Sequence, residues 1–392
     1  MGNAYIVGAV RTPGGRKNGK LSNWHPSDLG ALVLDELVKR TRAKGELIDD
    51  VIFGCVSQAG AQSGNVARNA VLGSSLPESV PGTTVDRQCG SSQQAIHFAA
   101  QAVMSETQDI VIAGGVEVMS KVPIGAAIVD SYKAGHGQPF DGKGMTKRYP
   151  GVQFSQFAGA EMMAERWSLS REQLDSFAFA SHQKAINATE EGYFDREIVP
   201  VEGELSSGEK EMVTVDEGIR FDASPESLSG LNILSEDGVL TAGTSSQICD
   251  GAAAIMIVND AGLKKLSIKP RAKIVALALA GDDPVIMLTG PIPASKNVLN
   301  KAKLSIEDID LYEVNEAFAP VPLAWAHELG ADLDKLNVNG GAMALGHPLG
   351  GTGAKLMTTL LHELERREAK YGLQAICEGG GTANAMIIER LS

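Results

Sequence analysis

The sequence predicts an α/β protein with largely parallel sheets. Short runs rich in β-branched residues alternate with amphipathic helical stretches, which is the pattern of this fold class. Segments 49–56 (DDVIFGCV) and 109–120 (DIVIAGGVEVMS) are typical strands that lead into loops. Segment 25–40 is typical of a helix, because Pro26 suits a first turn, Asp28 lies near the positive end of the helix dipole and apolar residues recur on one face.

Three segments near the start of the chain have partners near its end. Each pair shares a local pattern, such as a strand followed by a glycine-rich turn and an apolar helix, and the pairs come in the same order. They are 45–56 with 304–318, 83–103 with 336–361, and 109–120 with 375–388. This order predicts a duplicated α/β unit with halves at residues 1–118 and 270–392.

The segment between the halves differs in character. Residues 119–249 begin with loops that contain glycine and proline, and continue into a helical stretch where Ser170 and Gln173 fit a capping box. We interpret 119–249 as an inserted loop domain and 250–269 as a return to the first half. Insertions of that length usually carry function.

Composition excludes several classes of protein. The chain has 392 residues, of which 43% are hydrophobic and 21% charged, as in a globular protein with a large core. Its formal net charge is −13, so nucleic acid is a poor partner for the molecule as a whole. A polyanionic ligand requires a local basic patch.

The cysteines and the apolar runs indicate in which compartment of the cell the protein is expected. The chain has 4 cysteines, too few and too scattered for a disulfide framework, and no C-x-x-C pair indicates zinc or redox work. No stretch approaches the roughly 20 apolar residues of a membrane span, and the first residues lack the pattern of a secretory leader. We therefore expect a cytoplasmic protein with no metal site and no contact with membranes.

A cysteine stands where a predicted strand turns into a predicted helix. At Cys89, backbone N–H groups and the helix dipole favour negative charge, which is expected to lower the pKa of the thiol and make it a nucleophile. Gly90 and the small Ser91 and Ser92 leave room for another group to approach the sulfur. A free cysteine is also commonly a small buried hydrophobe, so the position alone leaves both readings open.

The second half supplies possible partners for such a nucleophile. His347 lies in a glycine-rich loop that opens a helix, where it is either a base for the thiol or a capping or core histidine. Cys377 ends a strand and precedes three glycines, which form either an oxyanion hole or a tight turn. Asn315 ends another strand, where its amide either holds a water or caps a turn.

Four sequence blocks together resemble one family. DRQCGSSQQAI, NEAF, GHPLGGTGA and CEGGG occur in the order and spacing of the thiolases, and the resemblance covers essentially the whole chain. It implies a five-layered αβαβα fold of two similar halves, with a loop domain that holds coenzyme A. It also implies a homodimer or homotetramer that needs no cofactor, since coenzyme A is a substrate.

The same resemblance implies an activity and a role for each site residue. Thiolases cleave 3-ketoacyl-CoA with CoA to acetyl-CoA and a shortened acyl-CoA, or condense acetyl-CoA in reverse, by a ping-pong mechanism. Cys89 would be the acylated nucleophile, His347 its base, Cys377 the second acid/base and Asn315 the holder of a catalytic water. His347 with that water would form one oxyanion site, and the backbone N–H groups of Cys89 and Gly379 the other.

The coenzyme A contacts and the acyl pocket follow from the same resemblance. Arg220 stands where thiolases have an arginine near the adenine and phosphate end of coenzyme A, and Ser246 where a serine meets the pantetheine. Short-chain biosynthetic members have a His-Met pair where this chain has residues 155–157 (SQF), and Cys249 replaces a common asparagine. These departures predict a roomier acyl pocket and substrates longer than acetoacetyl-CoA.

Two other readings use related folds. A ketoacyl synthase-like condensing enzyme also combines Cys with His, but it lacks a cysteine before the last glycine run, and Cys377 argues against it. A non-catalytic lipid-carrier relative of the thiolases would have lost a catalytic residue. None of the four is missing here.

Overall fold

The computed structural model describes residues 2–205 and 207–391. Its first half alternates strands and helices, and a last strand joins it after the inserted segment. The elements are β1 (Tyr5–Arg11), α1 (Pro26–Thr41), β3 (Asp50–Gly54), α2 (Val66–Gly73), β4 (Gly82–Val85), α3 (Ser91–Met104), β5 (Ile110–Val118) and β8 (Cys249–Val258). The predicted strands and the predicted helix of this half are confirmed.

The second half repeats this succession. Its elements are β9 (Ala272–Gly281), α10 (Pro291–Ala302), β10 (Leu311–Val314), α11 (Pro320–Leu329), α13 (Thr352–Arg366), β11 (Tyr371–Glu378) and β12 (Thr382–Arg390). The counterpart of β4 is reduced to an isolated parallel bridge between Tyr312 and Leu336. The duplication predicted from the sequence is therefore a structural one.

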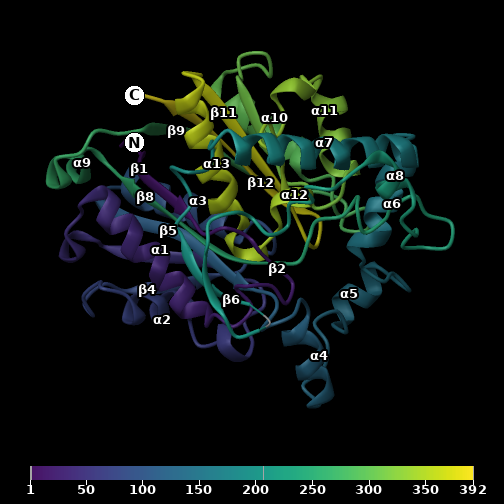
Figure 1. The fold of residues 1–392 in the computed structure, drawn as a ribbon, viewed down its shortest axis with the longest axis horizontal. Coiled ribbons are helices and arrows are strands. Elements are labelled where there is room, and N and C mark those ends of the chain that lie inside the picture. The colour runs from purple at the N-terminus through teal and green to yellow at the C-terminus, as the bar shows by residue number, and fades with distance from the viewer. Residues whose placement is uncertain (1, 206, 392) are drawn as a thin grey trace.

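The two halves share one twisted sheet. The strand order is β10-β11-β12-β9-β1-β8-β5-β3-β4, so each half contributes its strands in the same spatial order. The halves meet where β1 pairs with β9, antiparallel, through Tyr5 with Lys273 and Ile6 with Ala272. Figure 1 shows the first half in purple and blue and the second in green and yellow.

The expectation of largely parallel sheets is wrong. The pairs β3–β4, β3–β5 and β10–β11 are parallel, but β1–β8, β5–β8, β11–β12 and β12–β9 are antiparallel. Strands joined through a helix return parallel. β1 and β9 lead through α1 and α10 to β3 and β10, but the last strand of each half, β8 or β12, lacks such a crossover and runs antiparallel to both of its neighbours. The alternation of local patterns did not reveal the direction of these last strands.

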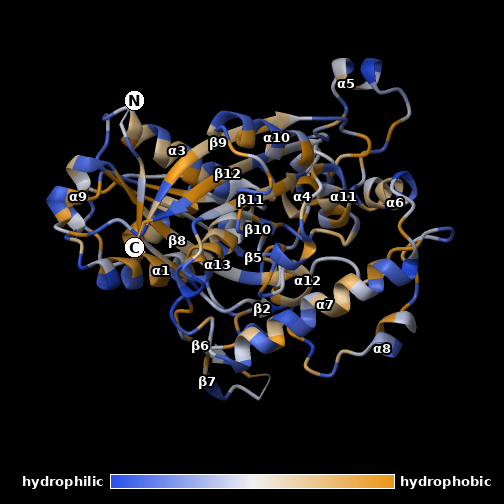
Figure 2. Ribbon diagram, turned by 90° about the horizontal axis from the view of Figure 1, so that it is seen from above, coloured by the Kyte–Doolittle hydropathy of each residue, from blue (hydrophilic) through white to orange (hydrophobic). Residues whose placement is uncertain are grey.

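Three apolar clusters define five layers. One cluster packs α1 and α2 on one face of the first half's strands, and another packs α10 and α11 on the corresponding face of the second half's strands. Between them, α3 and α13 fill a central layer that contacts strands of both halves. Figure 2 shows β9 and β12 as largely apolar strands that lie side by side. This arrangement confirms the five-layered αβαβα fold.

A pair of aspartates shows how closely the halves correspond. The Asp49 carboxylate accepts hydrogen bonds from the backbone N–H groups of Asp109 and Ile110, where β5 begins. Asp310 accepts the same two bonds from Lys370 and Tyr371, where β11 begins. Counting forward equally from Ile110 and Tyr371 makes Glu117 of β5 the counterpart of Glu378 of β11.

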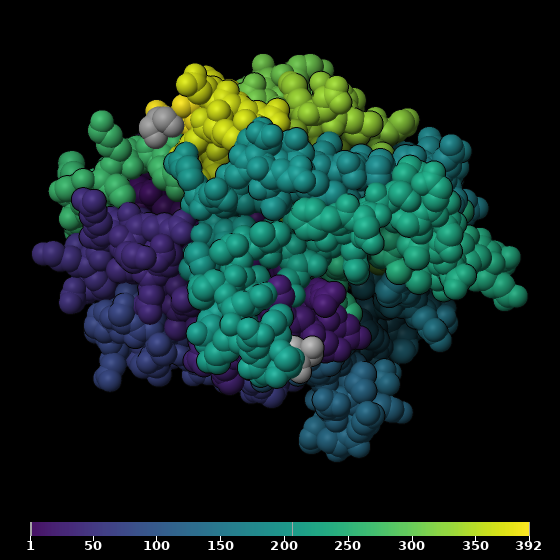
Figure 3. All heavy atoms as spheres, viewed as in Figure 1, coloured from purple at the N-terminus to yellow at the C-terminus, as the bar shows by residue number. Residues whose placement is uncertain are grey.

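The inserted segment lies over one face of the molecule, where Figure 3 shows it in teal. Ser170 and Gln173 form the predicted capping box at the start of α7. The buried guanidinium of Arg11 on β1 bonds Glu197 and Asp216 of the insertion and ties it to the first half. Its elements are α4 (Ala126–Lys133), α5 (Lys143–Arg148), α6 (Gln156–Arg166), α7 (Arg171–Glu190), β6 (Val201–Glu204), β7 (Lys210–Val213) and α8 (Pro225–Ser229).

Short elements complete the chain. They are β2 (Gly15–Arg16), α9 (Asp260–Leu266), α12 (Ala342–Leu345) and 3-10 turns at Gly45–Leu47, Gly60–Gln62, Leu333–Lys335 and Leu349–Gly351. Within residues 2–205 and 207–391, none of the helices is long and apolar enough to cross a membrane.

Candidate active site

Cys89 lies in the turn between β4 and α3, as the sequence predicted. Gln88 has a positive φ of 49°, which bends the chain sharply just before the cysteine. The Cys89 side chain is half-buried, and together with Gln88, Gly379 and Gly380 it lines a cavity of about 620 Å³. The turn therefore presents the sulfur to a space large enough for part of a ligand.

The electrostatics of Cys89 differ from the sequence-based expectation. The pKa of its thiol is raised to about 12, mainly by burial and next by the Glu378 carboxylate, although its own backbone N–H group lowers it. The helix start therefore does not compensate for the loss of water around the sulfur. At neutral pH Cys89 is a thiol, and it becomes a nucleophile only if another group accepts its proton.

His347 is suited to accept a proton. Burial lowers its pKa to about 3, and the nearby Lys355 lowers it too, so the imidazole is neutral at pH 7. The Thr352 hydroxyl donates to the carbonyl oxygen of Pro348 and lies 2.5 Å from His347 Nδ1. This assigns the proton to Nδ1 and leaves the lone pair on Nε2.

Asn315 lies beside that lone pair. Its Nδ2 is 3.5 Å from His347 Nε2, and its buried Oδ1 has no hydrogen-bond partner among the described residues. A buried amide oxygen without a partner has unused capacity to accept a hydrogen bond. The structure thus brings together Asn315 and His347, which come from separate loops of the second half.

Cys377 is buried near the end of β11. Burial raises the pKa of its thiol well above the ordinary value, and Cys89 is the largest contributor after burial. The two thiols therefore lie near enough to influence each other. Of the glycines that follow, Gly380 and Gly381 have positive φ values of 83° and 75°, which glycine adopts without strain.

The cavity beside Cys89 is mainly apolar away from the sulfur. Phe154 lines it and contacts the rings of Phe140 and Tyr149, with centroids 5.8 and 5.4 Å apart. The side chains that line the apolar part come from the insertion and from the second half: Ile124, Ile128, Phe140, Met145, Tyr149, Phe154 and Met287.

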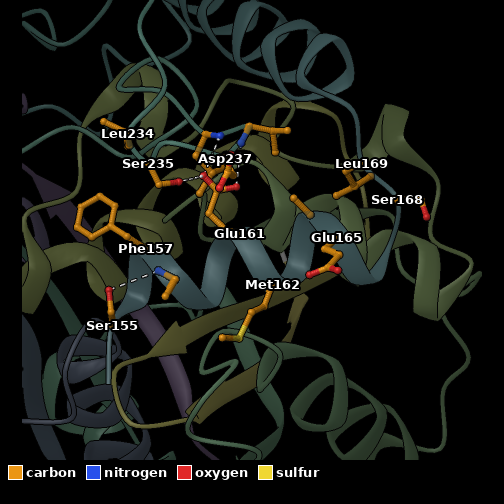
Figure 4. A pocket seen from close by; sticks show the side chains of 14 residues that line it. Ser155, Phe157, Glu161, Met162, Glu165, Ser168, Leu169, Leu234, Ser235 and Asp237 are labelled. Carbon is orange, nitrogen blue, oxygen red and sulfur yellow. Dashed lines mark hydrogen bonds between the residues drawn. The ribbon is translucent and has the colours of Figure 1, made fainter. Parts of the chain in front are cut away.

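The residues at 155–157 divide between two cavities. Gln156 lines the cavity of Cys89. Ser155 and Phe157 line a separate groove of about 1040 Å³ on α6, in which Glu161 bonds the 235–240 segment (Figure 4). Phe157 is 49% exposed and packs edge-on against Phe318. Phe157 therefore does not fill the space beside the thiol.

The two residues expected to contact coenzyme A lie on the insertion. Arg220 is exposed and lines a cavity of about 320 Å³ together with His182, Asp222 and Gln247. Ser246 is half-buried, and its backbone N–H donates to Ala317 near Asn315. Ser246 does not line the Arg220 cavity itself, although the adjacent Gln247 does.

Sequence reasoning missed two groups at this site. Thr352 holds the His347 ring, and Glu378 influences both thiols. An available signal for Glu378 was an acidic residue at the buried end of a strand, directly after Cys377. Thr352 gave no comparable signal, because a threonine at the first position of a helix is ordinary.

Known proteins match the chain along its length. Residues 4–261 match the family model for the N-terminal domain of thiolase, and residues 268–390 match that for its C-terminal domain. The steroid 3-ketoacyl-CoA thiolase FadA6 of Mycobacterium tuberculosis is 51% identical over 392 residues, which is 100% of this chain and 95% of the relative. A 3-ketoacyl-CoA thiolase of Aliivibrio fischeri is 43% identical over 397 residues, with both chains covered completely.

Solved structures of thiolase enzymes also match the fold of this chain. Bacillus anthracis acetyl-CoA acetyltransferase superposes with a TM-score of 0.90 at 38% identity, covering 100% of this chain and 99% of that one. Human mitochondrial 3-ketoacyl-CoA thiolase gives a TM-score of 0.90 at 36% identity with the same coverage. The chain, an acyltransferase with the fold and the sequence blocks of these enzymes, therefore belongs to the thiolase family.

Proposed function

We propose that this thiolase cleaves 3-ketoacyl-CoA with CoA through an acyl group carried on Cys89, and catalyses the reverse condensation when acetyl-CoA accumulates. One observation carries the proposal: Cys89 lines a cavity of about 620 Å³, and it lies near enough to the buried Cys377 to raise the pKa of that second thiol. A neutral histidine whose Nε2 lone pair faces Asn315 Nδ2 at 3.5 Å supports it.

The residues present can donate and accept every proton that moves in this reaction. The Cys89 sulfur attacks the 3-keto carbon while its proton passes to His347, and the bond between C2 and C3 breaks. The departing enolate of acetyl-CoA takes the proton of Cys377. The incoming CoA thiol then gives its proton to the Cys377 thiolate and attacks the acyl group, and Cys89 recovers its own proton from His347.

The remaining roles concern charge and binding. Asn315 would hold a water that, with His347, stabilises one oxyanion, and the backbone N–H groups of Cys89 and Gly379 would stabilise the other. The insertion at 119–249 would bind coenzyme A, with Arg220 near its phosphates and Ser246 near its pantetheine. The reaction needs no cofactor or metal, and we place the enzyme in the cytoplasm as a homodimer or homotetramer.

The acyl pocket favours groups larger than acetyl. The apolar side chains around Phe154 and the position of Phe157 outside the cavity support this. The name of the FadA6 relative extends the candidates to ring-bearing side chains. Each buried methylene contributes up to about 0.8 kcal/mol, or roughly a fourfold gain in kcat/KM per carbon while the pocket lasts.

The decisive experiment identifies the acylated residue. The enzyme is incubated with acetyl-CoA, quenched in acid, digested and mapped by mass spectrometry, with Cys89→Ala and Cys377→Ala as companions. We expect the acetyl group on Cys89 in the wild type and in Cys377→Ala. An acetyl group on Cys377, or on no cysteine, would overturn the proposal.

A chain-length series tests the pocket. We expect kcat/KM for 3-ketoacyl-CoAs of six and eight carbons to equal or exceed that for acetoacetyl-CoA. Ile128→Trp should reduce the rates for longer chains more than the rate for acetoacetyl-CoA, because Ile128 lines the cavity. Val129→Trp is the matched control, since Val129 is 49% exposed and does not line it. A tenfold fall from four carbons to six in the wild type contradicts a roomy pocket.

A further inference from the structure

The carboxyl group of Glu378 lies directly behind Cys89. Its side chain is fully buried at the end of β11, and its Oε2 accepts a hydrogen bond of 2.7 Å from the Thr382 hydroxyl. Its Oε1 has no hydrogen-bond partner among the described residues. A Cβ atom on Gly90 would lie only 2.0 Å from that oxygen, so the carboxyl rests against the backbone of the residue after Cys89.

The counterpart in the first half shows what a structural carboxylate looks like at this position. Glu117 accepts hydrogen bonds from the backbone N–H groups of Val56, Ser57 and Gly350 and from the Gln62 amide, at 2.7 to 3.0 Å. These bonds occupy both oxygens. Glu378 accepts a single side-chain bond, so holding loops together does not account for its presence.

The surroundings of Glu378 contain few other charges. The loop before α3 presents Arg87, which favours the ionised carboxylate, and the Cys89 thiol. The same strand presents Cys377, and β12 presents the uncharged Thr382 and Asn384. The Asn384 amide donates to the Gly90 carbonyl oxygen, which fixes the turn against this cluster.

We propose that Glu378 is a positioning residue that controls the protonation of the Cys89 and Cys377 thiols. Ionised, it opposes negative charge on both sulfurs and so adds to the effect of burial, which favours the thiols until a base takes a proton. When the Glu378 carboxyl is neutral, it no longer opposes negative charge on the two sulfurs. The effect on turnover rests on the proposed roles of the two cysteines, but the effect on thiol reactivity does not.

The carboxyl group of Glu378 changes its charge near neutral pH. Burial raises the pKa of Glu378 to about 7, although the Thr382 hydrogen bond and Arg87 lower it. Near neutral pH the carboxyl is therefore part neutral and part ionised. A thiol held protonated in the resting enzyme is protected from oxidation, and a thiolate formed beside a negative charge is a stronger base. Both properties suit a site that deprotonates carbon.

The test measures thiol alkylation as a function of pH. Full-length wild type and Glu378→Gln are treated with iodoacetamide between about pH 6 and pH 10, and each cysteine is followed by peptide mass spectrometry. We expect Cys89 in Glu378→Gln to react about three to ten times faster at pH 8, because removing a nearby like charge lowers a pKa by up to about one unit. Superimposable profiles for Cys89 would overturn the proposal.

Cys249 serves as an internal control for loss of structure. It is buried, and Glu378 is not among the groups that shift its pKa. If Cys89 and Cys249 both accelerate by the same factor in Glu378→Gln, the variant has merely loosened, and the proposal falls. Acceleration at Cys89 alone supports it.

Thr382→Val provides a second variant that keeps the carboxyl. Losing the Thr382 hydroxyl raises the pKa of Glu378, so Cys89 should react faster than in the wild type near pH 7 to 8 and at the wild-type rate above about pH 9. A rate equal to the wild type at every pH contradicts the proposal. If acetyl mapping fails on Cys89 while these shifts appear, the proposed function is wrong and the role of Glu378 stands.

Discussion

The two halves of the molecule are alike where they hold the sheet and unlike where they meet a ligand. Asp49 and Asp310 make the same pair of backbone hydrogen bonds at the starts of equivalent strands. At the ends of those strands, Glu117 is saturated with donors whereas one oxygen of Glu378 has none. A duplicated scaffold can thus retain its supports while one copy of a residue is freed for chemistry.

The first turns of the central helices show the same contrast. The Ser91 hydroxyl accepts from the Arg87 backbone N–H and donates to the Gln88 carbonyl oxygen, which closes the turn that carries Cys89. Thr352 donates to Pro348 in the equivalent turn of α13, and it also holds His347. One copy of the turn carries the proposed nucleophile, Cys89, and the other carries the proposed base, His347.

Removing the proposed base, His347, should have the largest effect. His347→Ala is expected to lower kcat/KM for thiolysis by about 10²–10⁴-fold, the usual contribution of a general base. Thr352→Val should cost less, about tenfold, because the ring remains but loses its fixed orientation. Steady-state kinetics with acetoacetyl-CoA measure both. Equal losses in the two variants would mean that the ring acts only through Thr352.

The two buried glutamates, Glu117 and Glu378, should contribute differently to the stability of the folded protein. Glu117→Ala leaves three backbone N–H groups and an amide without an acceptor, so we expect a loss of about 3–5 kcal/mol in the free energy of unfolding. Glu378→Ala should lose less than about 1 kcal/mol. Urea unfolding followed by circular dichroism measures both. Similar losses would show that the counterparts have the same structural role.

A pH series sharpens the same comparison. Because the folded-state pKa of Glu378 is about 7, above its ordinary 4.5, the unfolded chain loses this proton first as pH rises. The contribution of Glu378 therefore lowers stability progressively between these pKa values, by at most about 3 kcal/mol, and stays constant above them. The Glu378→Gln side chain does not ionise, so the variant has no such contribution. Its stability relative to the wild type should rise by about 1–3 kcal/mol between pH 5 and pH 8, and a constant difference would contradict the raised pKa.

The smallest expected effects come from the aspartates. Asp49→Ala and Asp310→Ala each remove an acceptor from two backbone N–H groups near the surface, and each should cost about 1–2 kcal/mol. The comparison predicts that the two losses agree within about 0.5 kcal/mol. Thermal melting of both variants checks this, and a clear inequality would show that the halves are not equally supported.

The sequence predicted the arrangement better than the energetics. Repeated segments and glycine-rich turns were enough to predict the duplication, and the positions of Cys89 and Cys377 at strand ends followed from local patterns. The direction of β8 and β12 did not, because strand direction depends on partners far away in the chain. The pKa of Cys89 was misjudged for a related reason. The helix dipole is visible in the sequence, but burial and the nearby Glu378 exist only once the halves have packed.

The place of β8 has a consequence for the making of the protein. This strand lies between β1 and β5 in the sheet, yet it follows the whole inserted segment in the chain. A ribosome must therefore release the entire insertion before the first half can close, and until then the facing edges of β1 and β5 lack their partner. Open strand edges are where chains join wrongly to one another. During synthesis, we therefore expect the nascent first half to present strand edges that favour aggregation until β8 joins the sheet.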